Sequence, residues 1–242
     1  DLPSDIFTIF SQWGGFWEGQ SSCNFNYMLN EDRYQSHFDK VRFVTRATKI
    51  IGDIEKAEIR QEVKNRLLGE ARLARGWIMY FLLTYYGPVP VIVDYEKVGD
   101  NEAENDLTRP SRETFVGYIA DDFRFAADHL EVEPDEYGRF NKGLALTLLM
   151  RLYMNEKNFI NAESTGREIM ALGYSLVDNY HSLFWEATER NSETIWAVSC
   201  SEDDETKNFN PIAFYCYPED YPGQKVIKGG WGDGVFMVTW DF

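Results

Sequence analysis

The sequence is poor in the residues that build metal centres and in segments that cross membranes. Its 242 residues include only three cysteines, Cys23, Cys200 and Cys216, and three histidines. The cysteines are scattered and form no CxxC pair, which argues against a zinc site. Both a Cys200–Cys216 bridge and free buried thiols remain open. No run of about 18 apolar residues is present, so no transmembrane helix is predicted.

Basic side chains are also scarce. The chain has 24 Lys and Arg against 40 Asp and Glu, which gives a net charge of −16. Such a surface repels phosphate backbones and anionic headgroups, and this argues against nucleic acid as a partner. The 44% hydrophobic and 16% aromatic content is enough for a sizeable core, and it argues against disorder.

Motifs for catalysis are lacking too. His37, His129 and His181 lie far apart in the sequence, and there is no HExxH, GxSxG or P-loop pattern. Two carboxylates placed to hydrolyse a glycosidic bond are the weaker interpretation. Among 40 Asp and Glu residues, some lie close to one another by chance. The run Glu202–Glu205 could offer oxygens to calcium, but it lacks the spacing of a calcium loop. We therefore predict no enzyme, no metal and no cofactor.

One long helix dominates the middle of the sequence. Apolar side chains at steps of three or four predict an amphipathic helix from about Lys56 to Tyr86, ended by Gly87-Pro88. The predicted inward face comprises Val63, Leu67, Ala71, Ala74, Ile78, Phe81 and Tyr85. Ala71 and Ala74 should let a second helix approach closely. We expect Glu70, Arg72 and Arg75 to be structural ion-pairing groups. After Pro88 and Pro90, Val91–Val93 suits a short edge strand or an extended segment.

Further helices are predicted on both sides of this one, over residues 35–54, 112–130, 140–156 and 159–172. Ser111 is a good N-cap, and Gly173 a good stop. Residues 94–109 are expected to be a polar loop, and Glu193–Cys200 alternates like a strand. Two antiparallel helix pairs followed by a fifth helix predict an all-α, tetratricopeptide-like superhelix with a few short strands.

Aromatic, glycine-rich segments flank the helices. We expect one domain over 1–242, with an aromatic loop region at 1–34, a helical core at 35–173 and an irregular ligand-binding region at 174–242. The first ten residues are typical of the middle of a protein, and the last eight end inside an apolar-aromatic run without a turn or cap. The sequence is therefore interpreted as a piece of a longer protein that lacks both ends.

The flanking aromatics suit a sugar, whose apolar C–H face stacks on a flat ring while amides and carboxylates bond its hydroxyls. The alternative is that these rings pack loops that lack helices. The candidate ligand-binding residues are Trp13, Trp17, Asn24, Tyr27, Asp203, Tyr215, Tyr217 and Trp231.

An ordered set of motifs resembles the SusD/RagB family of Bacteroidetes nutrient-binding lipoproteins. The motifs are Gly69-Glu-Ala-Arg-Leu-Ala-Arg75, Tyr86-Gly-Pro-Val-Pro90, Arg109-Pro-Ser-Arg-Glu113, Gly138-Arg-Phe-Asn-Lys-Gly143, Leu148-Leu-Met-Arg-Leu-Tyr153, Gly173-Tyr-Ser-Leu176 with Tyr180 and Leu183-Phe184, and Asn191-Ser-Glu-Thr-Ile-Trp196. They cover about residues 60 to 200 in the family's order. Trp77 and Asn141 depart from the usual pattern. The lipid-anchoring cysteine is absent, and the chain is roughly half the family's usual length.

The resemblance implies a surface-exposed lipoprotein of the outer membrane that takes part in polysaccharide utilisation. It implies non-enzymatic binding of a glycan and delivery to a SusC-like TonB-dependent transporter, against which the helical side packs. The lipid anchor would lie outside this sequence. Open alternatives are the same scaffold binding peptides or another nutrient, a helical glycoside hydrolase, and a general tetratricopeptide interaction scaffold.

Overall fold

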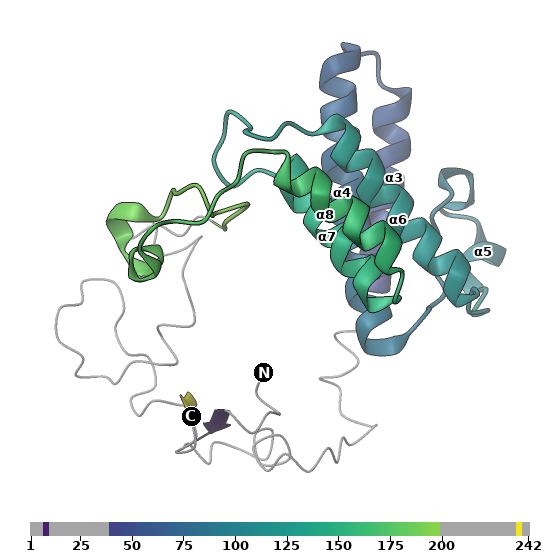
Figure 1. Cartoon of the computed structure of the whole chain (residues 1–242). Coiled ribbons are helices and arrows are strands. Elements are labelled where there is room, and N and C mark those ends of the chain that lie inside the picture. Colours follow the sequence, from purple (N-terminus) through teal and green to yellow (C-terminus); the bar gives the residue numbers. More distant parts are fainter. Residues whose placement is uncertain (1–6, 10–38, 199–235, 239–242) are drawn as a thin grey trace. The chain divides into compact units, whose positions relative to one another are not determined.

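The computed structural model describes residues 7–9, 39–198 and 236–238 (Figure 1). The chain divides into two compact units, residues 32–198 and residues 1–31 with 199–242. In the second unit, β1 (Phe7–Ile9) pairs antiparallel with β2 (Phe236–Val238), with Thr8 opposite Met237. This confirms the expectation of a few short strands. The single domain over 1–242 stays a prediction.

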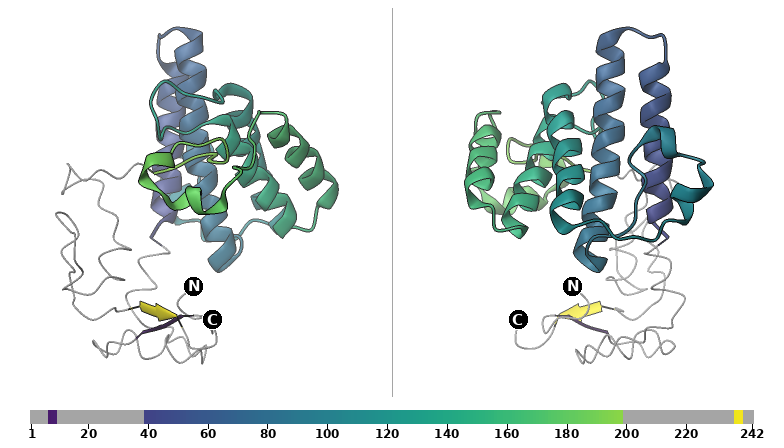
Figure 2. Two further views of the ribbon diagram at one scale, coloured as in Figure 1. Left: turned by 60° about the vertical axis from the view of Figure 1, so that its left-hand side comes forward. Right: turned by 90° about the vertical axis from the view of Figure 1, so that its right-hand side faces the viewer.

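The first unit is an array of antiparallel helices. They are α3 (Val41–Lys56), α4 (Gln61–Tyr86), α6 (Arg112–His129), α7 (Lys142–Asn155) and α8 (Phe159–Met170). Each helix packs on the next one along the chain, and Figure 2 shows them side by side in that order. The predicted all-α, tetratricopeptide-like arrangement is confirmed. Two helix starts differ from the prediction: α3 begins at Val41 rather than at 35, and α4 begins at Gln61 rather than near Lys56.

Local signals mark several helix ends, and those at Ser111, Gly87 and Gly173 agree with the prediction. The Ser111 hydroxyl accepts a hydrogen bond from the Thr114 N–H at the start of α6, and the Asn141 side chain accepts one from the Leu144 N–H at the start of α7. Gly87 and Gly173 have φ values of 72° and 94°, a region in which a side chain is strained. They therefore stop the chain after α4 and α8.

The core lies where α4, α6 and α7 meet. Phe115, Ile119 and Phe123 of α6 are fully buried, and so are Leu149 and Leu152 of α7. The buried residues of α3 include Val44, Thr48 and Ile51.

The predicted inward face of α4 is wrong. Its members are only half-buried, and Tyr85 is 66% exposed. The buried residues are Leu68, Gly69, Leu73, Arg75, Gly76, Met79, Leu82 and Leu83. Because α4 lies between α3 and α6, its buried surface is wide. That surface contains Arg75, Gly69 and Gly76. A prediction that follows apolar residues alone assigns such residues to the exposed face of the helix.

Glycine, rather than the predicted alanine pair, lets α6 approach α4. A Cβ added at Gly76 would lie 2.9 Å from the Phe123 ring, and one at Gly69 would lie 3.0 Å from the Leu130 side chain. Both distances are shorter than an ordinary van der Waals contact. A larger residue at either position would therefore require the α6 side chain opposite it to shift.

Three local predictions are corrected between the helices. The expected polar loop at 94–109 contains a 3-10 turn, η1 (Tyr95–Lys97), and a short helix, α5 (Asn101–Asn105), which begin at the capping side chains of Asp94 and Asp100. The strand expected at 193–200 is absent over its described part, 193–198. Alternation alone predicted it, but no extended neighbour pairs with it there. Val91–Val93 forms neither a helix nor a strand, so the predicted short edge strand is absent there.

Candidate functional site

The eight candidate ligand-binding residues lie outside the described residues: Trp13, Trp17, Asn24, Tyr27, Asp203, Tyr215, Tyr217 and Trp231. The same holds for His37, the three cysteines and the run Glu202–Glu205. The assignment of these aromatic residues to sugar stacking therefore stays a prediction. The described residues belong mainly to the helical unit and to the segment that leaves it.

Arg75 forms a buried polar centre in the array. Its Nε and Nη2 donate to the two carboxylate oxygens of Asp122, each at 2.7 Å, and its Nη1 donates to Thr48 Oγ1 at 3.0 Å and to the Val93 carbonyl at 3.1 Å. Burial raises the pKa of Asp122, and the Arg75 guanidinium opposes that rise. One side chain thus ties together α3, α4, α6 and the exit segment after α4.

The other predicted ion-pairing groups are also structural. Glu70 accepts two hydrogen bonds at 2.9 Å from Arg139, which fastens the turn before α7 onto α4. Arg72 lies 3.7 Å from Glu55 of α3, and its guanidinium lies 4.1 Å from the centre of the Phe125 ring. The prediction for Glu70, Arg72 and Arg75 is confirmed.

The described residues offer little to acid–base or metal chemistry. The His129 ring stacks on Phe125 at 4.1 Å and its Nδ1 lies 2.8 Å from the Phe125 carbonyl oxygen, so this ring is held by packing. His181 is exposed on a turn. Within the described ranges, no three His, Cys, Asp or Glu side chains are placed to hold a metal ion. None of the described helices has the length and apolar character to cross a membrane.

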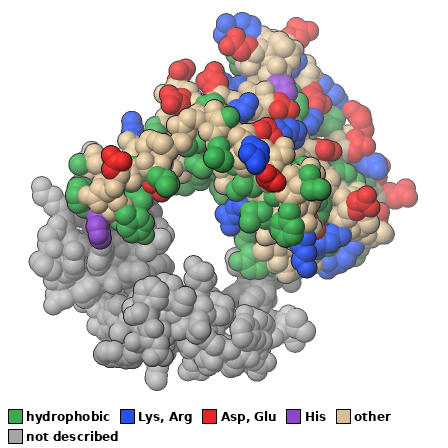
Figure 3. All heavy atoms as spheres, in the orientation of Figure 1, with side chains coloured by type: hydrophobic (Ala, Val, Ile, Leu, Met, Phe, Trp, Pro, Cys, Tyr) green, Lys and Arg blue, Asp and Glu red, His purple; other side chains and the backbone are tan. Residues whose placement is uncertain are grey.

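Exposed aromatic rings gather on the segment after α8, residues 174–198, here called the arm. An Asn179-capped 3-10 turn, η2 (Tyr180–Phe184), is followed by η3 (Glu186–Thr188). Tyr180, Phe184 and Trp185, here called the aromatic turn, are 68%, 72% and 55% exposed. Figure 3 shows hydrophobic side chains gathered on the arm.

The aromatic turn is an exposed aromatic surface that sequence reasoning missed. Tyr180 and Phe184 pack edge to face, with ring centroids 5.4 Å apart. The sequence feature that could have indicated this surface is the spacing of Tyr180 and Phe184, four residues apart in a stretch without a helical pattern. In the sequence, these two residues stand out only as members of the family motif.

Both ends of the arm are fastened near the start of α7. At the first end, Tyr174 packs where a side chain at Gly143 would otherwise lie. At the second, the Asn141 amide donates to the Ile195 carbonyl at 2.8 Å, and Trp196 Nε1 donates to the Gly138 carbonyl at 3.0 Å. The arm is therefore a loop that leaves the array and returns to it.

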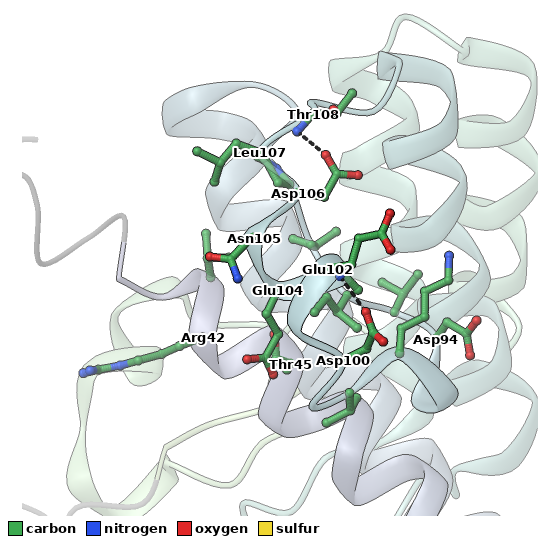
Figure 4. A pocket seen from close by; sticks show the side chains of 18 of the residues that line it. Arg42, Thr45, Asp94, Asp100, Glu102, Glu104, Asn105, Asp106, Leu107 and Thr108 are labelled. Atoms are coloured by element: carbon green, nitrogen blue, oxygen red, sulfur yellow. Dashed lines mark hydrogen bonds between the residues drawn. The ribbon is translucent and has the colours of Figure 1, made fainter.

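An open hollow lies beside α3, between that helix and residues 90–108; it is called the α3 hollow (Figure 4). Its volume is about 1600 Å³. Its lining includes the half-buried segment Val91–Val93 and Leu107, which is 81% exposed. Sequence reasoning missed this hollow because it interpreted 94–109 as a loop without structure.

The two walls of the α3 hollow carry opposite charge. The wall around α5 is acidic, with Asp100, Glu102, Glu104 and Asp106, and the α3 wall is basic, with Arg42, Arg46 and Lys49. Hydrogen bonds from Thr108 lower the pKa of Asp106. Charge of both signs around an apolar floor suits a protein segment better than a neutral sugar.

The sequence matches a described family. The model of the SusD-like_3 family, described as starch-binding and associating with the outer membrane, matches residues 5–154. A SusD-like protein of Bacteroides ovatus is 26% identical over 170 residues, covering 64% of this chain and 30% of that protein. The SusD-like protein P25 of Formosa agariphila is 25% identical over 169 residues, covering 68% and 32%. The chain thus spans about a third of the length of these curated relatives.

Solved structures share the fold. A SusD-like protein from Bacteroides fragilis has a TM-score of 0.60 and 27% identity, with 71% of this chain and 34% of that chain covered. A structure described as a laminarin-binding SusD-like protein has a TM-score of 0.75 and 21% identity, with coverage of 90% and 51%. Another, solved with a xylogluco-oligosaccharide, has a TM-score of 0.67 and 20% identity, covering 89% and 45%.

Proposed function

Because the chain belongs to the SusD-like family, we propose that it captures oligosaccharides at the cell surface and passes them, uncleaved, to a TonB-dependent transporter. The observation that carries this proposal is the family match over residues 5–154, whose description joins starch binding with the outer membrane. Two structural relatives are described with glucan ligands, one with laminarin and one with a xylogluco-oligosaccharide.

The aromatic turn supports a sugar as the ligand. Tyr180, Phe184 and Trp185 expose flat apolar rings on a short, capped turn. A ring that stacks on the C–H face of a sugar loses little conformational freedom, because its own backbone is already held. From the sequence alone, Trp13, Trp17, Tyr215, Tyr217 and Trp231 are proposed as further rings that bind the same class of ligand.

The proposal assigns binding without catalysis. The buried Arg75–Asp122 pair is fully engaged within the array, and His129 is held against Phe125. These groups are used by the scaffold, so they do not supply a free acid and base on an accessible surface. Hydrolysis would then belong to separate enzymes.

Location and partner follow from the same proposal. We place the protein on the outer face of the outer membrane, held by a lipid anchor outside this sequence, where it would cover a SusC-like transporter. The full-length protein with its transporter would be the functional unit.

The test is calorimetry of the full-length protein against a panel of neutral glycans and peptides. We expect saturable heat with at least one oligosaccharide and no new reducing ends after prolonged incubation. Heat only with peptides, or release of shorter sugars, would contradict the proposal.

Single substitutions then locate the site. Trp185→Ala, Trp13→Ala, Trp17→Ala and Trp231→Ala are each expected to weaken binding of the best glycan by about 1–2 kcal/mol where the ring stacks on the sugar. The matched control is Ile160→Ala, because Ile160 is 83% exposed on α8, away from the arm. If all four variants bind like the wild type, the assignment of the aromatic residues is wrong.

A further inference from the structure

The base of the arm contains three rings that pack on one another, Trp77, Phe140 and Trp196, here called the base cluster. Trp77 lies on α4, Phe140 lies just before α7, and Trp196 lies near the end of the arm. The Trp77 ring centroid is 5.6 Å from that of Trp196 and 6.1 Å from that of Phe140, and the other two centroids are 5.9 Å apart. All three rings are partly buried against the core. Each pair is therefore close enough for an aromatic contact.

Two separate elements hold the Trp196 side chain. Its indole N–H donates to the Gly138 carbonyl, in the segment before α7, at 3.0 Å. Its ring lies edge-on to that of Trp77 on α4, at an interplanar angle of 72°. Gly76, the residue before Trp77, is buried against Phe123 of α6. Trp77 therefore belongs to the packed part of α4, and together with Gly138 it fixes the place and the orientation of Trp196.

The two limbs of the arm are hydrogen-bonded to each other. The Ser175 N–H donates to the Ser192 carbonyl at 3.0 Å, and the Ser192 hydroxyl donates to the Ser175 carbonyl, also at 3.0 Å. The Val177 N–H donates to a carboxylate oxygen of Glu193 at 3.1 Å. The limb that leaves the array and the limb that returns to it are therefore held together.

Hydrogen bonds also brace the outer part of the arm, next to the aromatic turn. The Thr188 N–H donates to the Trp185 carbonyl at 3.0 Å, and the Thr188 hydroxyl donates to the Ser182 carbonyl. The Asn191 amide donates to the Thr188 carbonyl at 2.9 Å. Figure 1 shows the arm projecting from the array. Because the limbs and the outer part are bonded internally, we expect the aromatic turn to move with the base of the arm and not independently of it.

We propose that Trp77 is a positioning residue for the glycan site: by holding Trp196, it fixes where the aromatic turn lies relative to the array. Trp77 itself does not touch the sugar. An extended oligosaccharide that contacts both the aromatic turn and another part of the chain binds best when the arm is already fixed, because ordering the arm on binding costs conformational entropy. This inference rests on the proposed function, since the aromatic turn must contact a glycan for its position to matter.

The test uses calorimetry of full-length variants with the neutral oligosaccharide that gives the largest heat with the wild type. Trp77→Leu removes the ring but keeps an apolar side chain, whereas Trp77→Phe keeps a ring. Trp196→Phe, which loosens the same contact from the arm side, replaces Trp77→Leu if that variant does not fold. Hydrogen exchange of residues 174–198 measures how firmly the arm is held.

Two further variants separate positioning from general stability. Leu152→Ala is the matched control, because Leu152 is fully buried at the end of α7 away from the arm and its truncation should also lower stability. Trp185→Ala, alone and combined with Trp77→Leu, completes a double-mutant cycle between the base cluster and the aromatic turn.

Trp77→Leu should weaken binding about two- to tenfold, the range that corresponds to the loss of an aromatic contact. Trp77→Phe should recover most of this loss, and Leu152→Ala should stay within about twofold of the wild type. Hydrogen exchange in the arm should rise more for Trp77→Leu than for Leu152→Ala. The combination with Trp185→Ala should weaken binding by less than the product of the two single factors, because a turn that has lost a ring gains less from being positioned.

The contrary results separate this proposal from the proposed function. If Trp77→Leu binds like the wild type, or if Leu152→Ala weakens binding as much, Trp77 does not position the site and the proposed function stands. If the factors for Trp77→Leu and Trp185→Ala multiply, Trp77 acts without the aromatic turn and the proposal is wrong. If the wild type binds no oligosaccharide of the panel, the proposed function falls as well.

Discussion

The helical array and the arm use polar and apolar side chains in opposite ways. In the array, charged groups lie inside: Arg75 and Asp122 are buried and bind each other in the core. In the arm, large apolar groups lie outside, with the aromatic turn more than half exposed. Burying an ion pair costs desolvation free energy, which the pair offsets only when its geometry is good. An exposed ring contributes hydrophobic free energy only when another molecule or segment covers it. The array therefore uses its charged groups to hold its own form, whereas the arm leaves apolar rings exposed.

The largest expected effect comes from breaking the buried pair. Asp122→Ala should lower the free energy of unfolding by about 3–5 kcal/mol, because it leaves the Arg75 guanidinium buried without a counter-charge. Urea unfolding measures this. The neighbouring Asp121 is exposed, so Asp121→Ala is the matched control and should cost under about 0.5 kcal/mol. Equal losses for the two variants would mean that the pair does not hold the array.

Two glycine substitutions in the array should change its stability in opposite directions. Gly76→Ala forces a methyl group against Phe123 and Asp122 and should cost about 1–3 kcal/mol. Gly117→Ala on α6 meets nothing within 4 Å, so it should stabilise the protein by up to about 1 kcal/mol through helix propensity. Thermal melts of the two variants should shift in opposite directions. A stable Gly76→Ala protein would contradict the close approach of α4 and α6.

Asn141 joins the two regions, and its substitution tests whether they are separable. Asn141→Ala removes both the cap of α7 and the bond to the Ile195 carbonyl, with an expected cost of about 1–2 kcal/mol. Asn141→Ser keeps a capping oxygen and should restore about half of that loss. In limited proteolysis, cleavage within the arm should rise for both variants. If only Asn141→Ala increases cleavage, the bond to Ile195 does not fasten the arm.

The smallest effect concerns pH. Hydrogen bonds from Arg124 lower the pKa of Glu168, so this pair contributes stability above the unfolded-state pKa of glutamate and loses it as pH falls through the lowered value. Both side chains are more than a third exposed, and Glu168→Gln should therefore cost under about 1 kcal/mol at pH 7. The difference from wild type in urea unfolding should shrink towards acidic pH. A difference that persists at low pH would point to packing.

The sequence predicted the helices well because caps and stops are local signals. Ser111, Gly87 and Gly173 act on their own neighbours, so their effect could be inferred without the fold. The face of α4 could not be inferred, since Gly76 and Arg75 are buried only because α6 provides Phe123 and Asp122 opposite them. The roles of Glu70 and Arg72 were predicted, but their partners Arg139 and Glu55 were not.

The surfaces that meet other molecules were harder to predict. The α3 hollow depends on a short helix, α5, whose five residues are too few to give a periodic signal. The aromatic turn depends on how η2 exposes its rings, and composition gives only their presence. The eight candidate ligand-binding residues lie outside the described residues, and the proposed substitutions test three of them, Trp13, Trp17 and Trp231.

Because the arm is held at both ends, the length of the chain between its two anchors can change while the helical array stays the same. Tyr174 and Trp196 are fixed beside the same end of α7. The chain between them can therefore lengthen or shorten without moving either anchor. Loop closure entropy grows slowly, by about 0.6 kcal/mol for each doubling of length. Insertions between 176 and 190 should thus be tolerated, and a new binding surface can be fitted to the same array.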